Sequence, residues 1–98
     1  MRLIFEWDAR KARTNVKKHH VSFEEAKTVF NDPLLLTYPD ERHSETEERY
    51  ISIGYSNQRR TLLVIHTEQE SGEEILIRII SSRKATSRER EAYENTSE

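Results

Sequence analysis

Several features that point to other classes of protein are missing from this chain of 98 residues. It contains no cysteine, which excludes disulfide bonds, thiolate catalysis and cysteine-ligated zinc and fits a reducing compartment. No run is long or apolar enough for a membrane span or a signal peptide, so we expect a cytoplasmic protein without a membrane partner. The histidines show no metal-ligand spacing, and His43 and His66 have no evident partner. We therefore predict no metal site and no cofactor.

The chain is also short of apolar residues and rich in charge. Only 34% of its residues are hydrophobic, whereas 35% are charged, so the core is thin and most helices can bury a single stripe. We expect one domain over residues 1–94, followed by a frayed tail at 95–98.

The formal net charge of -2 hides a segregation of charge along the chain. Acidic residues gather in 40–48 and 68–74, whereas basic residues gather early and late. The early cluster is Arg10, Lys11, Arg13, Lys17 and Lys18, and the late cluster is Arg78, Arg83, Lys84, Arg88 and Arg90. Two patches that can face polyanions are therefore expected despite the nearly neutral total.

The first half of the chain predicts one strand followed by two helices. Alternating apolar residues indicate a strand at 2–7, and Asp8 can cap a helix over 9–19. The stripe of that helix predicted to be buried consists of Ala12, Asn15, Val16 and His19. Ser22 and Glu25 form a capping box for a second, short helix, which ends before Pro33.

The second half predicts four strands and a last helix. Strand patterns occupy 34–38, 48–55, 61–67 and the residues from 75 on, separated by a polar loop at 39–47, a hairpin loop at 56–60 and a turn at 70–73. Thr86 and Glu89 form a capping box for the last helix. The order β-α-α-β-β-β-β-α predicts an α+β domain, in which an antiparallel meander is packed by two N-terminal helices and one C-terminal helix.

Polar groups gather where the last predicted strand runs into the last helix. On that strand Arg78 lies between Leu76 and Ile80, where its side chain must reach water or hold an anion. Hydroxyl and cationic side chains follow at once, namely Ser81, Ser82, Arg83 and Lys84, and then the helix N-terminus. This end of the strand is therefore a candidate anion-binding region.

The motifs spread over the chain resemble those of the BrnT family of toxins from bacterial toxin-antitoxin pairs. In the first half they are Phe5-x-Trp7-Asp8-x-x-Lys11, Asn15-x-x-Lys18-His19, Val21-Ser22-Phe23-x-Glu25-Ala26 and Phe30-x-Asp32-Pro33. In the second half they are Glu48-Arg49, Gly54, Ile77-Arg78-Ile79-Ile80-Ser81-x-Arg83-x-Ala85, Glu89 and Tyr93. Because several signatures coincide at the right separations, the resemblance is specific and covers nearly the whole chain.

The resemblance implies a RelE-like ribonuclease fold and RNA cleavage that halts translation. It also implies neutralisation by a ribbon-helix-helix antitoxin, for which we expect a 2:2 heterotetramer that contacts operator DNA only through the antitoxin. One residue departs from the family pattern. His20 stands where the family usually has glycine, which ends a helix in a left-handed conformation without steric cost.

RNA cleavage without a metal needs a base for the 2'-hydroxyl proton, cations for the charge of the phosphorane and an acid for the leaving 5'-oxygen. The candidate catalytic residues are Glu48 or His19 as base, with Arg78 and Arg83 as cations. The candidate RNA-binding residues are Lys11, Arg13, Lys18 and Lys84.

Each of these residues also has a purely structural interpretation. Arg78 can form a salt bridge with Glu48 or Glu6, His19 can complete a helix end, and Arg83 can flank a turn. The basic helix face can simply be solvated. Basic patches alone therefore also suit a domain that binds RNA or the ribosome without catalysis, or a co-repressor subunit that acts with its antitoxin.

Overall fold

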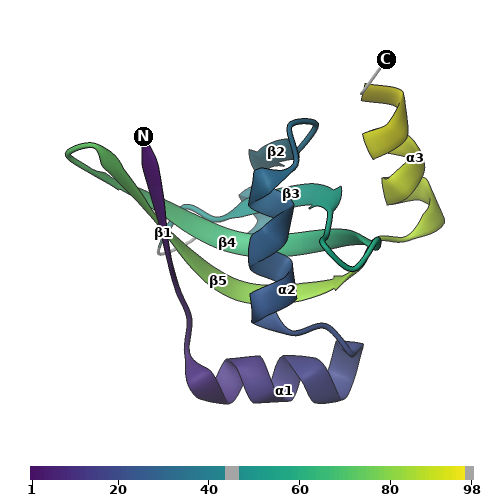
Figure 1. The fold of residues 1–98 in the computed structure, drawn as a ribbon, viewed down its shortest axis with the longest axis horizontal. Coiled ribbons are helices and arrows are strands. Elements are labelled where there is room, and N and C mark those ends of the chain that lie inside the picture. The colour runs from purple at the N-terminus through teal and green to yellow at the C-terminus, as the bar shows by residue number, and fades with distance from the viewer. Residues whose placement is uncertain (44–46, 97–98) are drawn as a thin grey trace.

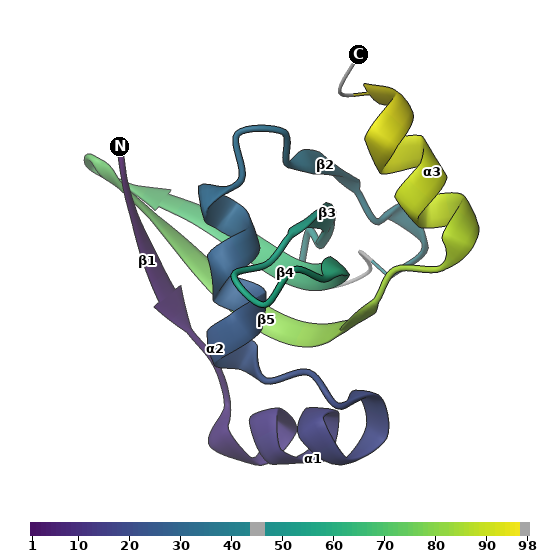
Figure 2. The same cartoon turned by 45° about the vertical axis from the view of Figure 1, so that its right-hand side comes forward.

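The computed structural model describes residues 1–43 and 47–96, apart from the side chain of His43, and shows one sheet with helices around it (Figures 1 and 2). The strands are β1 (Arg2–Glu6), β2 (Leu36–Pro39), β3 (Tyr50–Tyr55), β4 (Thr61–Ser71) and β5 (Glu74–Lys84). The α-helices are α1 (Ala9–His19), α2 (Phe23–Lys27) and α3 (Ser87–Thr96), and the short 3-10 helices are η1 (Thr28–Asn31) and η2 (Glu41–His43). The predicted element order and the α+β class are confirmed.

Local signals fix the helix boundaries. Asp8 accepts a hydrogen bond from the backbone N–H of Lys11, and Ser22 accepts one from the N–H of Glu25. Of the tail predicted at 95–98, Asn95 and Thr96 are the last residues of α3, while 97 and 98, like loop residues 44–46, lie outside the described residues. No helix in the described part of the chain is long and apolar enough to cross a membrane.

The sheet has the strand order β1-β5-β4-β3-β2. The meander from β2 to β5 is antiparallel, as predicted. The edge strand β1 instead runs parallel to the first half of β5, from Arg2 opposite Glu74 to Glu6 opposite Arg78, so the sheet is mixed. The sequence pattern predicts the strand at 2–7 but not this pairing, because alternation shows which face is apolar and not which strand lies beside it.

Helix α2 and η1 cover one face of the sheet, which we call the covered face (Figure 2). The main core lies beneath them and contains Val21, Phe23, Ala26, Val29, Leu62, Val64, Ile77 and Ile79. Burying a valine, leucine, isoleucine or phenylalanine side chain contributes about 1.5–3 kcal/mol. This cluster therefore holds the two segments onto the sheet.

Helix α1 closes the edge of β5 beyond the end of β1, where the strand would otherwise be unpaired. The Asn15 side chain accepts a hydrogen bond from the Ser82 N–H (3.1 Å) and donates to the Ser82 carbonyl (2.8 Å). It also donates to the Val21 carbonyl (2.9 Å). Because the contact is this narrow, Val16 is 44% exposed, and its predicted burial is wrong.

A register shift in the pairing of β4 with β5 decides which way Arg83 points. Ile65 is opposite Ser81, but His66 is opposite Ile79, so Ile80 is an extra residue in β5. Strict alternation from buried Ile79 would turn Arg83 toward the covered face. After the shift Arg83 pairs instead with Leu63, which belongs to a separate apolar cluster on the other face, here called the open face.

Helix α3 stands beyond the end of β5 (Figure 1), and Tyr93 anchors it to the apolar cluster on the open face. The Tyr93 ring packs with Ile53 and Leu63, and its hydroxyl donates a hydrogen bond to Asp32. Burial and this bond raise the pKa of Tyr93 to about 12. The anchor leaves a hollow between α3 and the segment that follows β2.

Candidate active site

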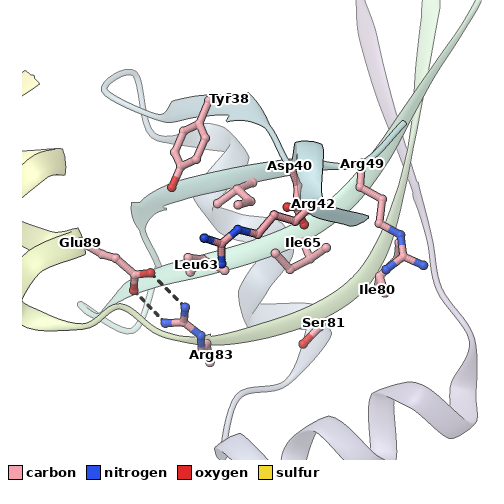
Figure 3. Close-up of a pocket in the computed structure, with 11 residues that line it drawn as sticks. Tyr38, Asp40, Arg42, Arg49, Leu63, Ile65, Ile80, Ser81, Arg83 and Glu89 are labelled. Carbon is pink, nitrogen blue, oxygen red and sulfur yellow. Dashed lines mark hydrogen bonds and ion pairs between the residues drawn. The ribbon is translucent and has the colours of Figure 1, made fainter. Parts of the chain in front are cut away.

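A pocket of about 400 Å³ opens on the open face (Figure 3). Its floor is apolar and comes from the three central strands, whereas its rim is polar. The floor consists of Ile51, Leu63, Ile65 and Ile80, and the rim of Tyr38, Asp40, Arg42, Arg49, Ser81, Arg83 and Glu89. Such a mixture, concave and apolar with a few convergent polar groups, is typical of ligand-binding sites.

Arg83 and Glu89 form a two-pronged ion pair at one end of the pocket (Figure 3). The guanidinium donates to the two carboxylate oxygens of Glu89 over 2.7 and 2.9 Å. Glu89 also accepts the N–H of Thr86 (2.8 Å) in the predicted capping box. The hydrogen bonds from Arg83 lower the pKa of Glu89 to about 2, despite the opposing effect of burial. The pair is therefore charged at neutral pH.

The far side of the rim adds a phenol, a carboxyl group and two more guanidinium groups. The Tyr38 hydroxyl points toward the pocket in Figure 3, and burial, assisted by the charge of Glu89, raises the pKa of Tyr38. Asp40 is buried. Its backbone N–H donates a hydrogen bond to the carbonyl of Arg49 (2.8 Å), which links the residue after β2 to the residue before β3. The pocket thus combines a protonated donor, a carboxylate and three arginines.

The predicted catalytic residues are not all brought together. Arg83 lines the pocket. Arg78 is exposed and shares the open face with Ile80, two residues further along β5, but it does not line the pocket. Glu48 accepts a hydrogen bond from the Tyr50 hydroxyl (3.2 Å), and the Tyr50 ring stacks on buried His66 at the covered face.

The predicted RNA-binding residues lie on α1 and beside α3. Lys11, Arg13 and Lys18 are exposed on α1, and His19 is half-buried at its end. Lys84 lines a second hollow, on the other side of the start of α3 from the main pocket.

Sequence reasoning missed four rim residues of the pocket, namely Tyr38, Asp40, Arg42 and Arg49. Arg49 carried a usable signal, because it alternates with Ile51 and so shares its face. Tyr38 lies at the end of a short predicted strand, and Asp40 and Arg42 lie in a predicted loop where no periodicity assigns a direction.

The structure also gives His66 a partner, contrary to expectation. Its Nε2 atom is 2.7 Å from the Ser52 hydroxyl, which is itself 2.7 Å from the Thr37 hydroxyl. Burial lowers the pKa of His66 to about 4, so the ring is neutral at pH 7. Because Ser52 and His66 are both fully buried, this pair is a contact within the core and cannot reach a substrate.

No three histidine or acidic side chains gather to hold a metal ion within residues 1–43 and 47–96.

Comparison with known proteins identifies the family of this chain. Residues 7–89 match the family model described as "Ribonuclease toxin, BrnT, of type II toxin-antitoxin system". The chain belongs to the BrnT family. The resemblance inferred from the motifs is thereby confirmed.

Among solved structures, the chain is similar to the ribonuclease toxin BrnT of Brucella abortus, known from a crystal structure at 1.1 Å resolution. The two share 25% sequence identity and superpose with a TM-score of 0.62, over 89% of this chain and 100% of that chain. No curated protein sequence matches the chain.

BrnT-family membership settles the general activity. The family comprises ribonuclease toxins of type II toxin-antitoxin systems, so this chain is a ribonuclease with an antitoxin as partner. The residues matched to the BrnT family include the whole rim of the pocket, from Tyr38 to Glu89.

Proposed function

We propose that this toxin cleaves RNA without a metal ion and that the scissile phosphate binds in the pocket on the open face. The observation that supports this most directly is the Arg83–Glu89 pair. A guanidinium group that donates two parallel hydrogen bonds to a carboxylate has the shape and charge to donate two to the oxygens of a phosphate. A phosphate entering the pocket then takes the place of Glu89.

The RNA supplies the nucleophile in this mechanism. Asp40 accepts the proton of the 2'-hydroxyl as its oxygen attacks the adjacent phosphorus. The bond from phosphorus to the 5'-oxygen breaks, and the Tyr38 hydroxyl gives that oxygen its proton. Arg83, with Arg42 and Arg49, stabilises the additional negative charge of the phosphorane. The products are a 2',3'-cyclic phosphate and a free 5'-hydroxyl.

The basic face of α1 extends the RNA-binding surface. Ser81, at the rim of the pocket, lies 3.4 Å from the Asn15 side chain, so α1 adjoins the pocket along β5. Lys11 and Lys18, seven residues apart, share one exposed side of α1 and contact flanking phosphates. Arg13, His19 and Arg78 add positive charge or hydrogen-bond donors around the same path.

The cellular role and the partner complete the proposal. The toxin cleaves RNA in the cytoplasm and so halts translation. Its fold is related to that of RelE-like ribonucleases. The partner is a ribbon-helix-helix antitoxin that covers the basic pocket, binds operator DNA and forms a 2:2 heterotetramer with the toxin. The mass of the purified complex by light scattering tests the stoichiometry, and a 1:1 complex would contradict it.

The reaction is tested with purified RNA in EDTA. We expect cleavage to continue in the chelator, to leave 2',3'-cyclic phosphate ends and to stop when the attacking nucleotide lacks its 2'-hydroxyl. Tyr38→Phe should lower the rate on the order of 10²-fold or more, because a positioned acid is lost. Tyr50→Phe, which removes a hydroxyl near the covered face, is the matched control. Cleavage that requires a divalent metal would contradict the proposal.

One observation favours the alternative of a non-catalytic RNA-binding or co-repressor protein. Arg83 is already neutralised by Glu89, so binding of a phosphate must displace an internal carboxylate. A folded wild-type protein that binds RNA or the ribosome and never cuts RNA, with or without metal, would support this alternative.

A further inference from the structure

A second hollow, of about 410 Å³, lies on the other side of the start of α3 from the main pocket. We propose that it binds a second nucleotide of the same RNA chain, with cations on the phosphate and the Tyr55 ring against the base. This inference rests on the proposed ribonuclease function and adds a subsite to it. The cations are Arg59, Lys84 and Arg90.

The two hollows are neighbours because consecutive residues divide between them. Arg83 lines the main pocket and Lys84 the second hollow, while Glu89 lines the main pocket and Arg90 the second hollow. The start of α3 and the end of β5 therefore form the wall between the two sites. An RNA strand that crosses this wall places one nucleotide on each side.

The charge of the second hollow is available for a ligand. All three cations are exposed, and none of them forms an ion pair with another described residue. A fourth cation in the lining, Arg60, is already bound to Glu25, and the lining also contains the acidic residue Glu94. The hollow thus offers three cationic side chains that an external anion can engage, whereas Arg83 in the main pocket already has an internal partner.

The backbone of Arg59 adds an independent observation. Its φ of 63° is left-handed, and glycine or asparagine would adopt this conformation in the hairpin loop at lower cost. The N–H of Arg59 donates to the Ser56 carbonyl (3.0 Å), a bond that any residue except proline can form. The Arg59 side chain forms no hydrogen bond or ion pair with another described residue, which leaves its guanidinium group available for binding.

Tyr55 favours RNA over an acidic polypeptide as the occupant. Its side chain is 48% exposed although it lies at the end of a central strand. Tyr55 also lines a third hollow, whose lining includes Asn31 and Asn57 together with the acidic Asp32. An exposed ring between cations on one side and amides on the other suits a nucleotide, because the base can stack while its edge forms hydrogen bonds.

The test uses 2'-O-methyl RNA, which the toxin cannot cleave, as an oligonucleotide of about 12 residues and as a dinucleotide. Arg59→Gly removes the guanidinium and keeps the left-handed turn, and Arg90→Ala removes a second cation. Each should lower the salt dependence of binding to the long RNA by about 0.7 in the log–log slope. Tyr55→Ala should weaken that binding at least about fivefold.

The dinucleotide and a distant substitution serve as controls. A dinucleotide has a single phosphodiester, which the main pocket binds, so it leaves no phosphate for the cations of the second hollow. Arg59→Gly and Arg90→Ala should therefore each lose several times more affinity for the long RNA than for the dinucleotide. Arg2→Ala, at the far end of β1, controls for charge alone.

Two results would overturn the proposal and leave the ribonuclease intact. The first is a wild type that cuts RNA while the variants bind long RNA with unchanged affinity and slope. The second is variants that lose affinity for poly-glutamate but not for RNA, which would assign the hollow to an acidic polypeptide. A wild type that neither binds nor cuts RNA would overturn the function itself, so the two failures are distinguishable.

Discussion

Two arginine–glutamate pairs with the same chemistry lie in different surroundings in this molecule. On the covered side, the Glu25 side chain is 1% exposed. It forms an ion pair with Arg60 and accepts a hydrogen bond from the Ser56 hydroxyl (2.7 Å). On the open side, the Glu89 side chain is 23% exposed and shares a pocket with its partner Arg83. The first pair is enclosed by protein, whereas the second faces space that a ligand can fill.

The difference in burial separates a structural pair from a binding pair. Burial opposes the charge of Glu25, but hydrogen bonds from Arg60 and Ser56 more than offset it, so the pKa of Glu25 is lowered. Arg60 also donates to the His20 carbonyl (3.1 Å) and so ties the hairpin loop to the end of α1. A ligand could replace Glu25 only by breaking these hydrogen bonds at a buried site. A phosphate can replace Glu89 more easily, because the Glu89 side chain is partly exposed and faces the pocket.

The largest expected effect is on the covered side. Arg60→Ala should destabilise the protein by about 3 kcal/mol, because it leaves the buried carboxylate of Glu25 without its countercharge. Urea denaturation measures the loss. Arg2→Ala, which breaks the exposed Arg2–Glu74 pair, should cost less than about 1 kcal/mol. Equal losses in the two variants would mean that burial does not distinguish these pairs.

A smaller effect is expected for Glu89→Gln, about 1 kcal/mol at pH 7, because this pair is partly solvated. The pKa of Glu89 is lowered from 4.5 to about 2 in the folded protein. Its contribution to stability is therefore complete above pH 4.5 and is lost as the pH falls toward 2. Unfolding free energies of wild type and variant should converge over that range. If the difference in unfolding free energy between wild type and variant did not change with pH, the lowered pKa of Glu89 would be contradicted.

The smallest effect concerns the end of α1, where His20 has φ 58° and ψ 34°. His20 therefore adopts the left-handed conformation that glycine usually supplies at this position. His20→Gly should stabilise the protein by about 0.5–1 kcal/mol, since relief of the side-chain clash exceeds the extra entropy that glycine loses. The hydrogen bond from Arg60 to the carbonyl is kept. Thermal unfolding checks the change, and a lower midpoint would refute the strain.

Local signals in the sequence were enough to predict the helices and the meander. Asp8 and Ser22 act as caps where the pattern placed them, because a cap depends on residues only three positions away. Glu25 was predicted to complete the second capping box. Its carboxylate instead binds Arg60, 35 residues away, and a contact that distant leaves no periodic trace in the sequence.

The site was less predictable than the fold for the same reason. Arg83 was expected at the anion-binding end of β5, but the extra residue at Ile80 that turns it toward the open face follows from strand pairing. Tyr38 lies on β2, the far edge strand of the sheet, and Asp40 directly follows it, so both reach the rim through strand pairing that the sequence pattern does not show. Glu48 and His19 fit the required chemistry by residue type, and their positions could not be inferred without the fold.

The measurement that tests the central claim most directly compares RNA cleavage by Arg83→Ala and Arg2→Ala. Each variant removes an arginine from a pair with glutamate, but only Arg83 lines the pocket. With folding verified by urea denaturation, Arg83→Ala should cleave RNA on the order of 10²- to 10³-fold more slowly, as expected when one donor to the transition state is lost. Arg2→Ala should cleave at the wild-type rate. A folded Arg83→Ala protein with wild-type activity would contradict the account.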